Sequence, residues 1–137
     1  MADRWVLRVL VAFLVMFVVN GAVAALVIGP LLERRYGDVV ATAVRPAPLV
    51  VGYLLIAVGV TVVHRVAAVG ADRRRAFLLG ACMGLAIFAG AHAVQAGYTT
   101  MDPVGWILSG VADAAGPTIA MVALSALEDR VGASARA

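Results

Sequence analysis

The sequence has 137 residues, of which 64% are hydrophobic, and its mean hydropathy is +1.01. A water-soluble protein of this length cannot bury so much apolar surface. The composition therefore excludes that class and predicts a single integral membrane domain over residues 1–137. The net charge is +3, and all eleven basic residues are arginines. They lie at the ends of apolar segments, which favours lipid headgroups over nucleic acid as partners.

Four apolar stretches are long enough to cross a hydrocarbon layer of about 30 Å, which takes roughly 20 residues of helix. They are residues 5–28, 47–67, 76–97 and 104–126. The pattern predicts an all-α fold, a four-helix transmembrane bundle. Arg4 and Arg8 in front of an apolar run are also typical of a signal peptide. Because the run continues to Ile28, we interpret it as a retained first helix.

Turn residues predict where these helices begin and end. Gly29 ends the first helix, and Pro30 opens a short interfacial helix that runs to Arg35. In the loop "GADRRRA", Gly70 ends the second helix and Asp72 caps the third.

The arginines predict an orientation in the cell membrane with both termini in the cytoplasm, because short cytoplasmic segments are rich in basic residues. In this orientation the inner side holds Arg4, Arg8, Arg65, Arg73, Arg74, Arg75, Arg130 and Arg136. The outer side holds only Arg34, Arg35 and Arg45.

Small residues in the third helix predict close helix packing. Gly80 and Gly84 form a G-x-x-x-G motif, which lets neighbouring backbones approach each other. A second row on the same helix consists of Ala86, Gly90, Ala93 and Gly97. Two small-residue faces are typical of a helix at the centre of a bundle, so we expect this helix to be central.

The fourth helix carries an aspartate, Asp113, within its apolar part, next to Gly116 and Pro117. Pro117 has no N–H to donate to the Asp113 carbonyl, so we expect a kink there. Each helix places one polar residue about 8 to 14 Å below the outer boundary, counted at 1.5 Å per residue. These residues and two others one turn away form the predicted polar cluster, Asn20, Tyr53, His92, Gln95, Ser109 and Asp113.

The cluster has two interpretations that the sequence leaves open. An ionisable group in a membrane marks a functional site by default, but polar side chains also join helices by hydrogen bonds. His64 and His92 lie about 20 Å apart along the membrane normal, so they cannot ligate one haem. His92, Asp113 and Asn20 make a poor metal site, and no oxyanion device accompanies Ser109. Cys82 is the single cysteine, so an intrachain disulfide is excluded. From these observations we predict no metal, no cofactor and no catalytic residue.

Several segments carry a family resemblance over roughly residues 31–126. They are "RRYGDVV", "VVGYLLIAVGV", "AFLLGACMGLAIF" and "DAAGP". Together they resemble the small four-helix bacterial membrane proteins that are grouped only as a domain of unknown function. The resemblance implies the four-helix architecture, a bacterial inner membrane and a role for Asp113.

Three function classes follow from these observations. We expect a non-enzymatic bundle that acts as an accessory subunit, a scaffold or a lipid-binding protein. The alternative is a small transporter or ligand-binding protein that uses Asp113 and His92 for a proton or a cationic solute. A third is an intramembrane enzyme that acts on a lipid or isoprenoid. The expected partners are membrane lipids, a second copy of the chain or a larger membrane complex.

Overall fold

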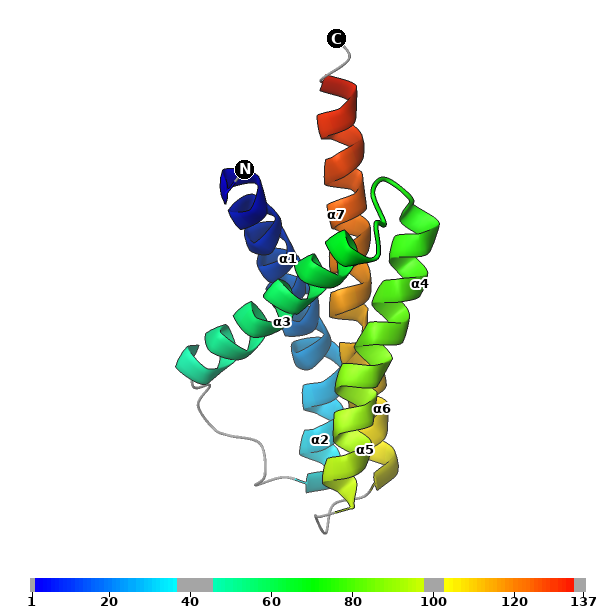
Figure 1. Cartoon of the computed structure of the whole chain (residues 1–137). Coiled ribbons are helices and arrows are strands. Elements are labelled where there is room, and N and C mark those ends of the chain that lie inside the picture. Colours follow the sequence, from blue (N-terminus) through cyan, green and yellow to red (C-terminus); the bar gives the residue numbers. More distant parts are fainter. Residues whose placement is uncertain (1, 37–45, 98–102, 135–137) are drawn as a thin grey trace.

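The computed structural model describes residues 2–36, 46–97 and 103–134, and all regular structure in these ranges is helical. Four helical runs are long and apolar enough to cross a membrane (Figure 1), and they confirm the four predicted helices. The runs are Arg4–Leu31, Pro46–Val66, Arg73–Ala96 and Pro103–Val131.

The first run does not end at Gly29, so that prediction is wrong. Helix α1 (Ala2–Val23) passes through a π-helical turn, η1 (Ala24–Ile28), directly into α2 (Gly29–Tyr36). The Gly29 N–H bonds to the carbonyl of Ala24, five residues back. This wider turn lies just before Pro30, which lacks an N–H, so the helix absorbs the proline and continues.

The second and third runs are α3 (Pro46–Val66) and α4 (Arg73–Gly84). As predicted, Asp72 caps α4, because its carboxylate accepts a hydrogen bond of 3.0 Å from the Arg75 N–H. Gly70 has a positive φ of 56°, but it lies beyond the end of α3 and so does not terminate that helix.

The third and fourth runs each contain an irregularity. The third continues through the π-helical turn η3 (Leu85–Ala89) into α5 (Gly90–Ala96). The fourth is interrupted at Ala114, between α6 (Pro103–Asp113) and α7 (Ala115–Ser134). The interruption immediately follows Asp113. Pro117 has no N–H, so it cannot donate a hydrogen bond to the Asp113 carbonyl. This agrees with the predicted kink.

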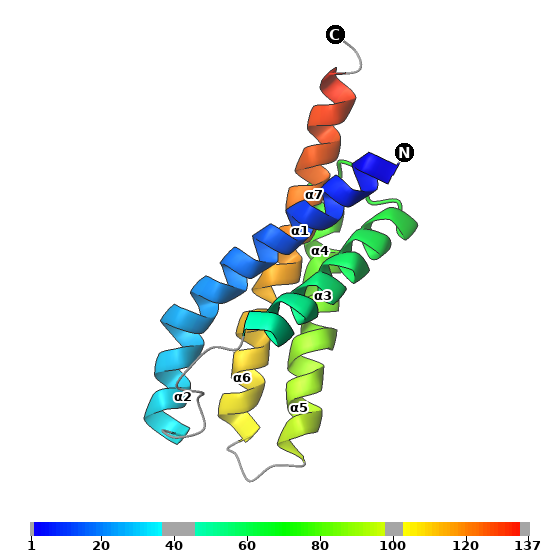
Figure 2. The same cartoon turned by 90° about the vertical axis from the view of Figure 1, so that its left-hand side faces the viewer.

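Helix α7, and not the third run, lies at the centre of the bundle. It packs against α1, α3 and α4 (Figures 1 and 2). In the apolar stretch of the fourth run 50% of the residues are buried, against 11% in that of the third run. Its buried side chains Met121 and Leu124 share one core with Met16 of α1 and Val60 of α3. Small residues permit close approach but add little contact area, so they did not identify the central helix.

The glycines of the third run show this difference directly. A Cβ at Gly80 would lie 2.7 Å from the Thr118 Cα, and one at Gly84 would lie 2.7 Å from the Ala114 carbonyl oxygen. Both glycines therefore pack against the backbone of the fourth run. A Cβ at Gly90 would meet nothing closer than its own helix, at 3.8 Å. The second small-residue row therefore makes no comparable close contact at this position.

The bundle has two ends, which we name after one residue each. The start of α1, the end of α3, the start of α4 and the end of α7 lie at the Arg73 end (Figure 1). Helices α2 and α5 and the start of α6 lie at the Trp106 end. Helix α3 runs obliquely and packs against α1 and α7 (Figure 2).

Candidate functional site

The predicted polar cluster separates into two groups, and the first joins α5 to α6. The Ser109 hydroxyl donates to the carbonyl of Trp106 over 2.7 Å, and its oxygen lies 3.2 Å from Nδ1 of His92. The His92 and Trp106 rings lie 5.0 Å apart at 34°. Since the hydroxyl proton already has an acceptor, Nδ1 is the donor toward Ser109. Ser109 is therefore held as a bridge between helices.

Two further residues complete this first group. The indole N–H of Trp106 donates to Oε1 of Gln95 over 3.3 Å. Gly110 allows the close approach, because a Cβ there would lie 2.6 Å from Nδ1 of His92 and 2.8 Å from the Phe88 carbonyl oxygen. Within the described ranges no carboxylate pairs with His92. The group thus has the geometry of a joint between two helices and lacks the acid of a Ser-His-Asp triad.

The second group consists of Asn20, Tyr53 and Asp113, from three different runs. Asn20 is completely buried. Its side chain packs against Gly116, where a Cβ would collide with Oδ1. Gly116 therefore admits the amide into the bundle, and Pro117 beside it is also fully buried.

The buried amide of Asn20 is not satisfied. It lies beside the Tyr53 hydroxyl, yet neither Oδ1 nor Nδ2 has a well-formed hydrogen bond to any described residue. A buried polar group without a partner costs about 1 to 3 kcal/mol. Such a residue in a packed bundle needs an explanation, and a bound molecule that supplies the missing partners is one.

Asp113 ends α6 and is only partly buried. Its carboxylate interacts electrostatically with Tyr53 and makes no direct hydrogen bond to Asn20 or His92. We expected a hydrogen-bond partner among these three residues, and the interaction with Tyr53 is electrostatic and not a hydrogen bond. Asp113 and His92, the two residues of the transporter alternative, make no direct contact that the described residues show.

A pocket of about 400 Å³ opens between α1, η1 and α3, beside this second group. It is lined by Phe17, Asn20, Gly21, Ala24, Ala25, Leu49 and Tyr53. We name it the Asn20 pocket. Its volume lies within the usual range for small-molecule sites, about 300 to 1,000 Å³. Asn20 and Tyr53 are the polar residues among those that line it.

A smaller hollow of about 180 Å³ lies on another face of the same part of α3. Leu49 and Tyr53 line both spaces, and Phe88 of η3 closes the smaller one. The aromatic ring of Tyr53 also contacts Phe17 edge-on, with centroids 5.9 Å apart. The start of α3 is therefore flanked by open apolar space, in contrast to the packed Arg73 end.

The sequence analysis missed a polar network at the Arg73 end. Nε2 of His64 lies 3.1 Å from the Ser125 hydroxyl, and both residues are buried. Arg8 of α1 forms an ion pair with Glu128 of α7, and Arg73 pairs with Asp129 over 3.2 Å. Glu128 and Asp129 lie beyond the predicted end of the fourth helix at residue 126. The only available signal was that acids follow this helix on the side where the arginines gather.

No group of three histidine, cysteine or acidic residues in the described ranges could hold a metal ion. Comparison with known proteins adds no constraint, because no family model, no curated protein and no solved structure matches this chain.

Proposed function

We propose that the protein is a non-enzymatic membrane bundle that binds a lipid-like molecule in the Asn20 pocket. The observation that supports this best is a completely buried amide, with no well-formed hydrogen bond to any described residue, beside an apolar space of about 400 Å³. A ligand with a hydrocarbon body would fill the space, and a polar head that displaced the side chains covering the amide would satisfy it. In this proposal both termini face the cytoplasm, as the arginine distribution favours.

The chemistry of the pocket restricts the head of the ligand. An amide offers one acceptor and two N–H donors, so it can bind a hydroxyl or a carbonyl. Asp113 faces Tyr53 at the same site, and a carboxylate nearby disfavours an anionic head. The best match is therefore an uncharged head on an apolar body, such as a diacylglycerol or an isoprenoid alcohol.

The transporter alternative has less support. It needs Asp113 and His92 to act together on one proton or cation, but His92 is bonded to Ser109 and Asp113 faces Tyr53. An enzyme acting on the bound lipid has no nucleophile with an adjacent base in the Asn20 pocket.

The test compares the protein with its Asn20→Leu variant, which has similar volume but no amide. Native mass spectrometry in detergent would measure retention of added diacylglycerol. We expect Asn20→Leu to retain it about ten-fold less, since one or two hydrogen bonds are lost. Leu55→Ala, at an exposed position of α3 outside the pocket, is the control and should retain the lipid normally.

The stability of the lipid-free protein separates loss of binding from loss of fold. Asn20→Leu removes an unsatisfied buried group, so its melting temperature should equal or exceed that of the parent. Equal retention of diacylglycerol by a folded Asn20→Leu variant would contradict the proposal.

A further inference from the structure

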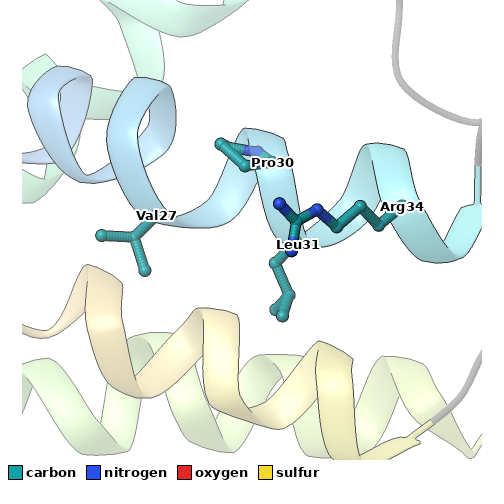
Figure 3. Close-up of a pocket in the computed structure, with 4 residues that line it drawn as sticks. All are labelled: Val27, Pro30, Leu31 and Arg34. Carbon is teal, nitrogen blue, oxygen red and sulfur yellow. The ribbon is translucent and has the colours of Figure 1, made fainter.

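A second open space lies along η1 and α2, further along the same helical run than the residues of the Asn20 pocket. It has a volume of about 410 Å³ and is lined by Val27, Pro30, Leu31 and Arg34. These positions follow the spacing of one helix face. Figure 3 shows Leu31 pointing toward the ribbon of α6, while the Arg34 side chain folds back along α2 toward Pro30 and Leu31. We name this space the Arg34 groove.

Arg34 differs from Arg8 and Arg73, two of the arginines at the opposite end of the bundle. Arg8 and Arg73 are paired with acids, whereas Arg34 forms no ion pair with another described residue and is exposed. Its alkyl stem follows the apolar wall, and its guanidinium lies over the groove (Figure 3). An arginine that covers apolar surface with its stem and keeps its charge at the rim is typical of a membrane interface.

The position of Arg34 along the helix fits that interface. The apolar sequence of the first run gives way to charged residues after Leu32, so Arg34 lies within one helical turn of the last apolar residue. In a bilayer that covers this apolar sequence, Val27 and Leu31 would lie at acyl-chain depth. The Arg34 guanidinium would lie near the phosphate groups.

We propose that the Arg34 groove binds an anionic phospholipid, with one acyl chain against Val27 and Leu31 and the phosphate on the Arg34 guanidinium. A volume of about 410 Å³ is more than ten times the ~30 Å³ that a water molecule occupies, so the groove can hold a hydrocarbon segment as well as an ion. The planar guanidinium can donate two parallel hydrogen bonds to phosphate oxygens. No lining residue is shared with the Asn20 pocket, so this site is independent of the proposed function.

The experiment reconstitutes the full chain with phosphatidylglycerol and phosphatidylcholine of identical acyl chains and measures the lipid retained by native mass spectrometry. We expect preferential retention of phosphatidylglycerol by the parent. Arg34→Gln should reduce that preference about ten-fold, and Arg34→Lys should retain part of it, because the charge remains without the two-pronged geometry. Leu31→Trp fills the groove and should reduce retention of phosphatidylglycerol while leaving Arg34 in place.

The matched control is Arg130→Gln, which removes an exposed arginine from α7 and should leave the preference unchanged. An equal loss in Arg130→Gln and Arg34→Gln would show a response to total charge and overturn the proposal. Normal retention by Leu31→Trp would do the same, as would displacement of the lipid by inorganic phosphate alone. A change from monomer to dimer that depends on Arg34 would assign the groove to a second copy and contradict the lipid.

Discussion

His64 and Ser125 show how much depends on single polar side chains in this bundle. They join α3 to α7 across 61 residues of sequence, and both are buried next to the Arg8–Glu128 pair. A hydrogen bond of this kind adds about 1 kcal/mol to the free energy of unfolding, but a buried polar group left without its partner costs more. The pair therefore fixes which helix faces meet at the Arg73 end.

Ser125→Ala should lower the free energy of unfolding by about 1 to 3 kcal/mol, because Nε2 of buried His64 loses its partner. Combining it with His64→Leu should recover part of the loss, since no polar group is then left alone. Unfolding in detergent micelles by titration with dodecyl sulfate measures both effects. Cys82→Ala, at an exposed position, is the control, and a Ser125→Ala variant as stable as this control would contradict the assignment.

At the scale of the elements, the sequence predicted the existence of the helices well and their neighbours poorly. Length and hydropathy alone placed the second run at residues 47–67, against Pro46–Val66 in the structure. Continuation of α1 into α2 could not be predicted, because Gly29-Pro30 is typical of a helix end. No local sequence signal indicates that a π-helical turn will let the helix continue through the proline.

The sequence indicated which polar residues share a depth, but not which of them meet. Counting residues placed the polar groups at similar depth, and His92 does meet Ser109. Depth does not fix rotation or the identity of the adjacent helix. Helix α6 contacts α5 and η3, but it also contacts η1 and α1, so Ser109 and Asp113 on one helix serve different neighbours.

The glycines of the third run give a prediction about helix packing. Gly84→Ala should destabilise the bundle by about 1 to 3 kcal/mol, because its Cβ would press on the backbone of Ala114. Gly90→Ala should be neutral or stabilising by up to about 1 kcal/mol, because alanine favours helix and the space is open. Melting temperatures in detergent compare the two variants directly. Equal losses would restore the third run to the central position that the sequence suggested.

At the scale of the whole molecule, the start of α1 and the end of α7 lie at the same end (Figure 1). This arrangement agrees with an even number of crossings. The orientation in the membrane is instead inferred from the arginines, most of which lie at the Arg73 end. We therefore expect that end to face the cytoplasm.

Labelling of single cysteines tests this orientation. Cys82 is exposed and must first be replaced by alanine. A cysteine at Val40, which lies outside the described residues, should react with an impermeant maleimide in intact cells. A cysteine at Ser134 should react only after the cells are opened. The opposite pattern would reverse the topology without changing the fold.

The central position of α7 has a consequence for biosynthesis. A ribosome completes this helix after the three preceding runs, yet it supplies Glu128 to Arg8 and Ser125 to His64, and its Gly116 makes room for Asn20. Until α7 enters the membrane, the three preceding runs carry polar groups whose partners have not yet been made, at a cost that lipid cannot relieve. We therefore expect these runs to stay beside the insertion machinery after their own translation, and the nascent chain to form the bundle only when α7 arrives.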